Sequence, residues 1–333
     1  MQLRVTVLGG GSWGTTVASL AARNTDSLLW ARSEEMVAEV NARHTNETYL
    51  PGCPLPESLR ATGSLEEAVS GCDVLVMGVP SHGFRSVLTA AAPHLRPWVP
   101  VVSLTKGLEQ GSLLRMTEVI EDVLPGHPVG VLTGPNLAKE IMAGFAAATV
   151  IATTDERIGT ELQKVFRTGL FRVYRNDDVV GCEVAGALKN VIAIASGMAD
   201  GIGVGDNTRS MVITRGLAEL SRLGEAMGGR ALTFAGLAGM GDLMATCISP
   251  QSRNRYVGEQ LGKGRRIDDV VAEMRMVAEG VKTTKVVMQL AEHFGVELPI
   301  AHEVYKVLYE GSNALDAYRG LTRHEARTEA DIA

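Results

Sequence analysis

The sequence lacks the cysteine and histidine patterns of metal-binding and disulfide-bonded proteins, and it lacks an excess of positive charge. Its four cysteines are scattered and form no C-x-x-C pair, which indicates neither a zinc site nor a disulfide framework. The seven histidines show no H-E-x-x-H or related spacing, so we expect no bound metal. Lys and Arg number 32 against 38 Asp and Glu, a net charge of −6. This balance gives no general attraction to nucleic acid or to an acidic membrane surface.

A membrane span and a leader peptide are also not indicated. No apolar run approaches the length that predicts a membrane-spanning helix. A first strand begins at once after the N-terminus, which leaves no room for a signal peptide. We therefore expect a cytoplasmic protein with no membrane insertion. The 333 residues, 45% hydrophobic and 21% charged, are typical of a soluble chain with two domains.

A glycine-rich turn near the N-terminus is the most informative stretch. Residues 3–8 form a short apolar run typical of a buried strand, and small and apolar residues at 17–22 indicate a helix. Between them Gly9, Gly11 and Gly14 are spaced as G-x-G-x-x-G. Strand, glycine turn and helix in this order predict a dinucleotide site, with the phosphates at the helix N-terminus. A glycine-rich turn that binds nothing is the alternative.

The hydrophobic pattern changes near the middle of the chain. Strand-like runs alternate with helical segments in the first half, which predicts a parallel, doubly wound, Rossmann-like sheet over residues 1–182. Beyond about Glu183 the apolar residues follow helical spacing, which predicts an all-helical domain over residues 183–333. Further strands are predicted at 27–31, 74–79, 101–104, 129–132, 147–152 and 170–174.

Two basic residues follow predicted strands at the edge where ligands bind in open α/β sheets. Arg32 ends the second strand, where an acidic residue would select the free ribose 2′-hydroxyl. An arginine there favours or tolerates the 2′-phosphate of NADP(H), although a solvated surface arginine is the alternative. Lys106 follows the strand at 101–104, where its charge would meet a bound ligand.

Lys189 is a further candidate for chemistry. It is the only basic residue between Arg175 and Arg209, and its helical neighbours Ala185 and Ala193 are small. A lysine held in such a groove can have a lowered pKa and transfer protons. A lysine whose amine reaches out to water is the alternative.

Two more stretches of the helical half carry polar groups at helix starts. Asp242 follows two glycines and could cap a helix, or accept a hydrogen bond from a substrate hydroxyl or from the Lys189 ammonium. Ser252, Arg253 and Asn254 follow a proline and begin a predicted helix. Free N–H groups and a guanidinium there predict an anion site for a phosphorylated substrate, with an N-capped surface helix as the alternative.

Eight ordered motifs together make the chain resemble bacterial NAD(P)-dependent glycerol-3-phosphate dehydrogenase over nearly its full length. They lie at residues 9–15, 79–82, 105–109, 134–140, 187–191, 238–243, 251–254 and 279–280. The resemblance implies reversible reduction of dihydroxyacetone phosphate to sn-glycerol 3-phosphate, which supplies glycerophospholipid synthesis. It also implies NADP(H) or NAD(H) as cofactor, a helical domain like that of 6-phosphogluconate dehydrogenase, and a homodimer.

The resemblance carries site roles to individual positions. It implies that the cofactor is bound by Gly9, Gly11, Ser12, Trp13, Gly14, Arg32, Tyr49, Lys106, Ala138, Arg253, Val277 and Glu279. It implies that the substrate is bound by Lys106, Gly134, Asn136, Lys189, Asp242, Ser252, Arg253 and Asn254. Lys189, Lys106 and Asp242 are the implied catalytic residues.

The implied mechanism is hydride transfer to the ketone carbon and proton transfer from Lys189 to its oxygen. Lys106 adds positive charge where the oxyanion develops, and Asp242 orients Lys189 or a substrate hydroxyl. Two alternatives remain at this point. One is a dehydrogenase of the same two-domain build that acts on a hydroxy acid or sugar acid. The other is a regulator that binds NADPH without catalysis.

Overall fold

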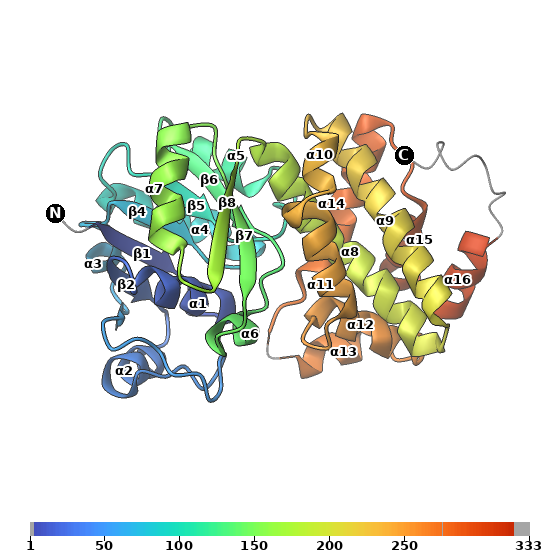
Figure 1. Cartoon of the computed structure of the whole chain (residues 1–333). Helices are drawn as coiled ribbons and strands as arrows, with labels where there is room; N and C mark the ends of the chain where they lie inside the picture. The colour runs from blue at the N-terminus through green and yellow to red at the C-terminus, as the bar shows by residue number, and fades with distance from the viewer. Residues whose placement is uncertain (1–2, 275, 323–333) are drawn as a thin grey trace. The chain divides into compact units, whose positions relative to one another are not determined.

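The computed structural model describes residues 3–274 and 276–322 (Figure 1). Its internal contacts divide the chain into two compact units. Unit 1 comprises Met1–Thr105 and Arg115–Val179, and unit 2 comprises Lys106–Leu114 and Val180–Ala333.

Unit 1 is built on one eight-stranded sheet with the order β3-β2-β1-β4-β5-β6-β7-β8. This order reverses direction at β1, as in doubly wound nucleotide-binding sheets. The strands are β1 (Arg4–Leu8), β2 (Asp26–Trp30), β3 (Arg60–Thr62), β4 (Val74–Met77), β5 (Val101–Ser103), β6 (Val129–Thr133), β7 (Ala147–Ala152) and β8 (Phe171–Asn176). The Rossmann-like sheet predicted from the sequence is confirmed.

Two details of the sheet differ from the sequence prediction. Strand β7 runs antiparallel to β6, so the sheet is only mostly parallel. The connection between them holds just the five-residue helix α6 (Ala138–Met142), and a short connection favours antiparallel pairing. The sequence pattern also missed β3, because three residues are too few to show alternation.

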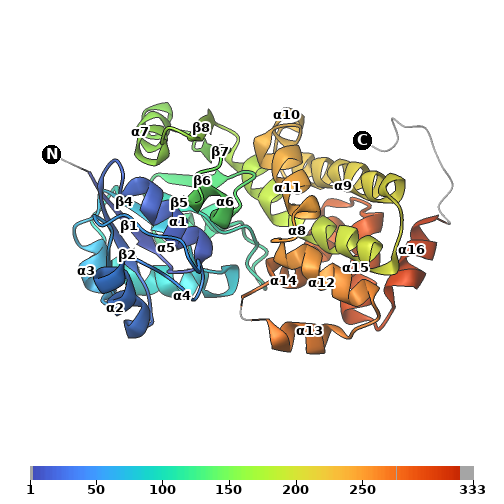
Figure 2. The ribbon, with the colours of Figure 1, turned by 60° about the horizontal axis from the view of Figure 1, so that its bottom comes forward.

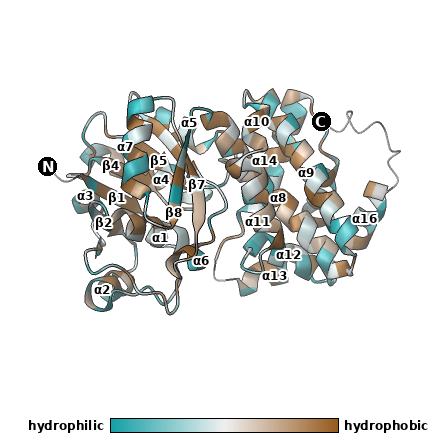
Figure 3. Cartoon of the chain, in the orientation of Figure 1, coloured by the Kyte–Doolittle hydropathy of each residue, from teal (hydrophilic) through white to brown (hydrophobic). Residues whose placement is uncertain are grey.

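Helices cover both faces of this sheet. Helix α1 contacts α6 and α7, which forms one group, and α4 contacts α3 and α5, which forms a second (Figures 1 and 2). Figure 3 shows hydrophobic colour along the inner strands, hydrophilic colour on the edge strand β8, and alternating colours along the covering helices, as amphipathic helices on a buried sheet require. Besides α6, the helices are α1 (Ser12–Ala21), α2 (Glu34–Arg43), α3 (Leu65–Val69), α4 (Ser81–Ala91), α5 (Met116–Val123) and α7 (Glu156–Phe166), with a 3₁₀ turn η1 (Ala92–His94).

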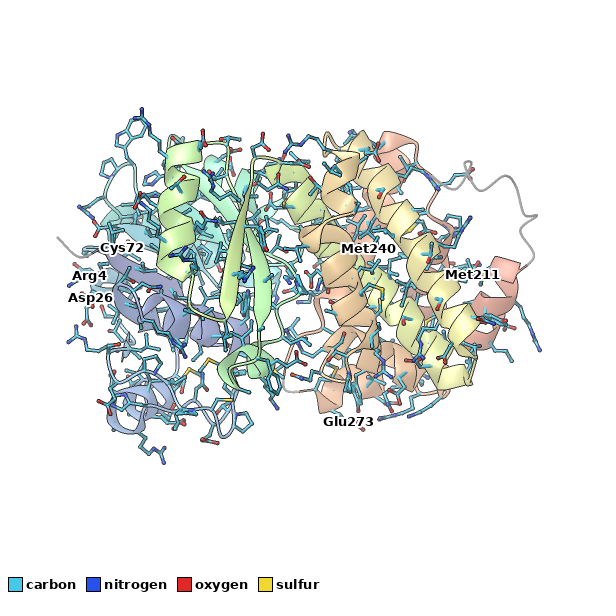
Figure 4. All side chains as sticks on the ribbon, viewed as in Figure 1. Arg4, Asp26, Cys72, Met211, Met240 and Glu273 are labelled. Atoms are coloured by element: carbon cyan, nitrogen blue, oxygen red, sulfur yellow. The ribbon has the colours of Figure 1, made fainter. Side chains whose placement is uncertain are left out.

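A surface ion pair lies where β1 and β2 begin. Arg4 of β1 and Asp26 of β2 are register partners, and Arg4 Nε donates to Asp26 Oδ2 at 3.2 Å (Figure 4). Both side chains are largely exposed, so the pair contributes only about 0–1 kcal/mol to stability. The register therefore depends on the buried alternate residues of the strands rather than on this pair.

Within its described residues, unit 2 is helical, as the change of period predicts. The elements are α8 (Val179–Ile202), α9 (Asp206–Ala226), α10 (Ala231–Phe234), a π-helical turn η2 (Leu237–Gly241), α11 (Asp242–Ile248), α12 (Arg253–Gly262), α13 (Ile267–Glu273), α14 (Glu279–Phe294), α15 (Pro299–Tyr309) and α16 (Ala314–Thr322). Gly295 ends α14 in a left-handed conformation (φ 65°), and Pro299 occupies the first turn of α15.

One segment of unit 2 comes from the first half of the chain. Residues 106–114 group with the helices because Leu108 is buried in their core and Leu113 packs against it. The domain boundary predicted from the sequence, at residue 182, does not show that residues 106–114 belong to the helical unit. Lys106 is consequently part of the helical unit.

The central helix α8 corrects one expectation about hydrophobic runs. The helix is long and apolar enough to cross a membrane, but 94% of its most apolar 18-residue stretch is buried inside the structure. A second apolar stretch, Ala231–Ile248, is 39% buried and includes the π-helical turn η2. The burial of α8 is that of a core helix.

Helix α8 meets α12 through backbone contacts at glycines. A Cβ atom on Gly197 would lie 2.0 Å from the carbonyl oxygen of Arg255, and one on Gly258 would lie 2.0 Å from that of Ile194. Each helix has a second glycine four residues later, Gly201 on α8 and Gly262 on α12. Only glycine permits this approach, because real Cβ atoms cannot sit at such distances.

We expect Gly258→Ala to lower the free energy of unfolding by about 3 kcal/mol, the upper end for overpacking. The added methyl group forces α12 away from α8. The matched control is Gly83→Ala on α4, where a Cβ meets nothing within 4 Å. Denaturant unfolding of both variants measures the difference. Equal transition midpoints would contradict the close packing.

Candidate active site

A buried carboxylate joins two lysines in unit 2. Lys189 lies on α8 and Asp242 is the first residue of α11. Lys189 Nζ donates to Asp242 Oδ1 at 2.5 Å, and Lys106 Nζ donates to Asp242 Oδ2 at 2.6 Å. Lys189 is 4% exposed and Asp242 is 2% exposed. Among the roles that the sequence left open for Asp242, the structure shows an acceptor for the Lys189 amine.

Thr246 completes this group, and sequence reasoning missed it. Lys189 Nζ donates to Thr246 Oγ1 at 2.5 Å, while Thr246 Oγ1 donates to the carbonyl oxygen of Asp242 at 2.6 Å. The hydroxyl proton is therefore directed away from the amine and a lone pair toward it. The available signal was spacing, since Thr246 follows Asp242 by four residues and shares its helix face.

The surroundings of Lys189 change its proton affinity. Burial lowers the pKa of Lys189 to about 8, an effect that the Asp242 carboxylate opposes and the Lys106 ammonium reinforces. An amine with a pKa near 8 exchanges protons readily at neutral pH. The alternative of a lysine whose amine reaches water does not hold, because this amine is enclosed.

A chain of amide hydrogen bonds links this group to two other helices. Asn190 Nδ2 donates to the carbonyl oxygen of Lys106 at 2.9 Å. Asn254 Nδ2 donates to Asn190 Oδ1 at 2.8 Å, and Asn254 Oδ1 accepts from the Gly280 N–H at 3.0 Å. Through Asn254, these hydrogen bonds hold the starts of α12 and α14 close to Asn190, the residue next to Lys189. Sequence reasoning missed Asn190, whose signal was its place next to the lysine.

The predicted anion site forms the start of α12. Ser252 is the N-cap and its Oγ accepts from the Arg255 N–H at 3.2 Å, so the expected helix start is confirmed. Ser252 and Asn254 are buried, whereas Arg253 is exposed and donates to the carbonyl oxygen of Val277 at 2.7 Å. A helix N-terminus of this kind presents N–H groups and a positive dipole end to an anion. Its role as a substrate phosphate site stays a prediction.

The glycine turn of unit 1 has the shape of a dinucleotide cradle. Gly9 has φ of 124°, and a Cβ there would lie 2.6 Å from the carbonyl oxygen of Gly78. A Cβ on Gly14 would lie 2.0 Å from the Gly9 carbonyl oxygen. By contrast, a Cβ on Gly11 meets nothing within 4 Å, which leaves that backbone open to a pyrophosphate. The residues present fit the predicted cofactor.

Other predicted cofactor positions in unit 1 surround this turn or follow it. Trp13 lies in the first turn of α1, and its buried Nε1 has no hydrogen-bond partner among the described residues. A buried unpaired donor needs a partner, as a ligand would supply. Arg32 is exposed after β2, and Tyr49 lies in the loop after α2. Their roles, with those of Ser12 and of Ala138 at the start of α6, stay predictions.

Asn136 and Gly134 shape the turn after β6. Gly134 has φ of 139° and its position lies against the backbone of Thr149. Asn136 Nδ2 donates to the carbonyl oxygen of Ala148 at 3.2 Å, and Asn136 Oδ1 accepts from Thr149 Oγ1 at 2.8 Å. The Asn136 amide thus binds the protein's own strand β7. Contact of either residue with substrate stays a prediction.

The remaining predicted cofactor positions precede or begin α14. Val277 accepts from Arg253, and Glu279 is the first residue of that helix. Among the described residues, no group of three or more His, Cys, Asp or Glu could hold a metal ion. The two lysines on Asp242 can perform proton transfer and electrostatic stabilisation.

A doubly wound sheet with a glycine cradle, followed by a helical unit with a buried lysine, is the build of a two-domain nicotinamide-dependent oxidoreductase. Comparison with known proteins gives the family. The chain belongs to the NAD-dependent glycerol-3-phosphate dehydrogenases: the model of the family's N-terminus matches residues 4–159 and that of its C-terminus matches residues 178–319.

Individual relatives agree over nearly the whole chain. A glycerol-3-phosphate dehydrogenase [NAD(P)+] of Sphingopyxis alaskensis is 61% identical, over 99% of each chain. One of Mycobacterium tuberculosis is 57% identical, over 96% of this chain and 94% of its own. The crystal structure of a glycerol-3-phosphate dehydrogenase from Coxiella burnetii is 36% identical, with a TM-score of 0.93 over 97% of this chain and 99% of that one.

Proposed function

We propose that this protein reduces dihydroxyacetone phosphate to sn-glycerol 3-phosphate with NADPH or NADH, reversibly, and supplies glycerophospholipid synthesis. The observation that carries the proposal is the enclosed Lys189 amine on Asp242, with the start of α12 tied to the next residue through Asn190. A proton donor and a phosphate anchor on the same unit fit a small phosphorylated ketone. The names of the close relatives support the same substrate.

In the proposed mechanism, residues of unit 2 bind the substrate and transfer the proton. The nicotinamide cofactor, when bound, supplies the hydride. The Lys189 ammonium donates its proton to the ketone oxygen, and Lys106 adds positive charge where negative charge develops. Asp242 holds both amines in place. The backbone N–H groups at the start of α12 anchor the phosphate with Ser252 and Arg253, so that binding energy from a remote group positions the reacting carbon.

The cofactor is proposed to bind unit 1 at the glycine turn, with Arg32 beside the adenosine ribose. A guanidinium at that position favours a 2′-phosphate, whereas a carboxylate would repel it. We also propose a homodimer located in the cytoplasm.

One assay tests the activity. Purified protein with dihydroxyacetone phosphate should oxidise NADPH or NADH, followed as loss of absorbance of the reduced nicotinamide, with each cofactor in turn. Free dihydroxyacetone is the matched control, and it should react far more slowly because it lacks the phosphate. Equal rates would favour a dehydrogenase without a phosphate requirement. Tight NADPH binding with no turnover of any small ketone would favour a non-catalytic regulator.

The pH dependence of the two directions should differ in sign. The pKa of Lys189 is lowered to about 8, and ketone reduction requires the ammonium form. Above that pH, kcat/KM for reduction should fall by about tenfold for each pH unit, while the reverse oxidation, which requires the neutral amine, should rise through pH 8. Steady-state profiles from pH 6 to 10 measure both, and a flat reductive profile across this range would contradict the assignment.

A further inference from the structure

An ion pair away from the Lys189 group joins α8 and α12. Asp200, in the last turn of α8, accepts from both Arg255 Nε and Arg255 Nη2 at 2.9 Å. Its second oxygen accepts from Arg209 of α9 at 3.2 Å. The side chains of Asp200 and Arg255 are 13% and 17% exposed, so this pair is screened less by solvent than a surface pair.

The two helices that this pair connects run parallel. Asn190 of α8 is hydrogen-bonded to Asn254 at the start of α12, and Gly201 near the end of α8 lies against Gly262 at the end of α12. Residue numbers rise together along both helices. The parallel arrangement places the start of α12, where the phosphate is proposed to bind, beside the part of α8 that carries Lys189.

Arg255 belongs to the first turn of α12, and its backbone N–H and its guanidinium both have partners. Its backbone N–H is capped by Ser252, and the neighbouring Asn254 is bonded to Asn190 and Gly280. Its guanidinium is bound by Asp200 and lies 3.5 Å from Glu259. Because Glu259 lies on α12 itself, the Asp200 contact is the one that ties the Arg255 guanidinium to α8.

We propose that Asp200 is a positioning residue for the phosphate end of the substrate, acting through Arg255. It sets the orientation of the N–H groups at the start of α12 relative to the Lys189 amine. The role rests on the proposed function, since it concerns how the phosphate of a small ketone is held. Asp200 itself takes no part in proton or hydride transfer.

The central test is Asp200→Asn, which keeps the size of the side chain and removes its charge. We expect KM for dihydroxyacetone phosphate to rise about tenfold, because a small misplacement of an anchoring group is costly. The kcat value and KM for NADPH should stay within about twofold, and reduction of free dihydroxyacetone should be unchanged, because no phosphate is bound. A purely structural role would change both ketones alike.

Two further variants sharpen the test. Arg209→Gln is the matched control, because it removes the other partner of the same carboxylate without touching α12, and it should leave KM unchanged. Arg255→Gln should reproduce the effect of Asp200→Asn, and the double variant should add nothing, as for residues that act as one unit. If Asp200→Asn does not fold, Arg255→Gln tests the same contact from its other side, and Arg255→Lys, which keeps the charge, should restore part of the loss.

The outcomes separate this proposal from the function on which it rests. Unchanged KM for dihydroxyacetone phosphate in Asp200→Asn and Arg255→Gln, or equal losses with phosphorylated and free ketone, would overturn the positioning role while the wild-type activity stands. A wild-type protein that reduces no dihydroxyacetone phosphate would overturn the proposed function itself.

Discussion

Lys189→Met should lower kcat for ketone reduction by roughly a thousandfold, within the usual contribution of a general acid. Methionine fills a similar volume but carries no proton. Affinity for NADPH should stay nearly unchanged, because the residues proposed to bind its phosphates lie in unit 1. Steady-state kinetics and a fluorescence titration with NADPH measure the two effects separately.

The variant should also fold, which makes the result interpretable. Asp242 keeps Lys106 as a partner at 2.6 Å, and the methionine enters a site bordered by the helical core. The matched control is Lys263→Met, an exposed lysine that ends α12 and pairs only with Glu259 among the described residues. It should retain full turnover. Near-normal turnover of Lys189→Met would show that another group protonates the substrate.

The fold was largely predictable because its signals are local. A strand, three glycines at fixed spacing and a helix define the nucleotide cradle, and Gly9 and Gly14 occupy positions where a Cβ would collide with backbone. The helical half is also recognisable locally, because its apolar residues follow helical spacing instead of the strand-like runs of the first half. The reversal of β7 and the three-residue β3 were missed, since neither leaves a periodic trace in the sequence.

The site was predictable in its residue types and less so in its connections. Small neighbours and a lone charge indicated that Lys189 is enclosed, which its burial confirms. The partnership of Lys106 with Asp242 depends on the segment 106–114 joining the helical unit. That exchange depends on the packing of Leu108, far along the chain from the helices it contacts. Contacts of this kind leave no local pattern.

Asp242→Asn should reduce stability and reductive turnover together. The wild-type carboxylate accepts from two amines at 2.5 Å and 2.6 Å, and an amide cannot neutralise either charge. Removing one partner of a buried ion pair typically costs about 3–5 kcal/mol, and the lower end is expected because Lys106 is partly exposed. The pKa of Lys189 should fall further, since the Asp242 carboxylate is the main group that raises it. Less of the ammonium form then remains at neutral pH.

The pH dependence and a second substitution test this reasoning. Because the folded-state pKa of Lys189 lies below its unfolded value, the unfolded chain binds more protons, and stability rises with pH from about 8 toward the unfolded pKa. The destabilisation of Asp242→Asn should therefore be larger at pH 7 than at pH 10, as measured by thermal unfolding. Adding Lys106→Met should recover part of the loss, because one of the two unpaired amines is removed. A double variant that loses the sum of both single effects would show that the carboxylate does not hold the two lysines as one unit.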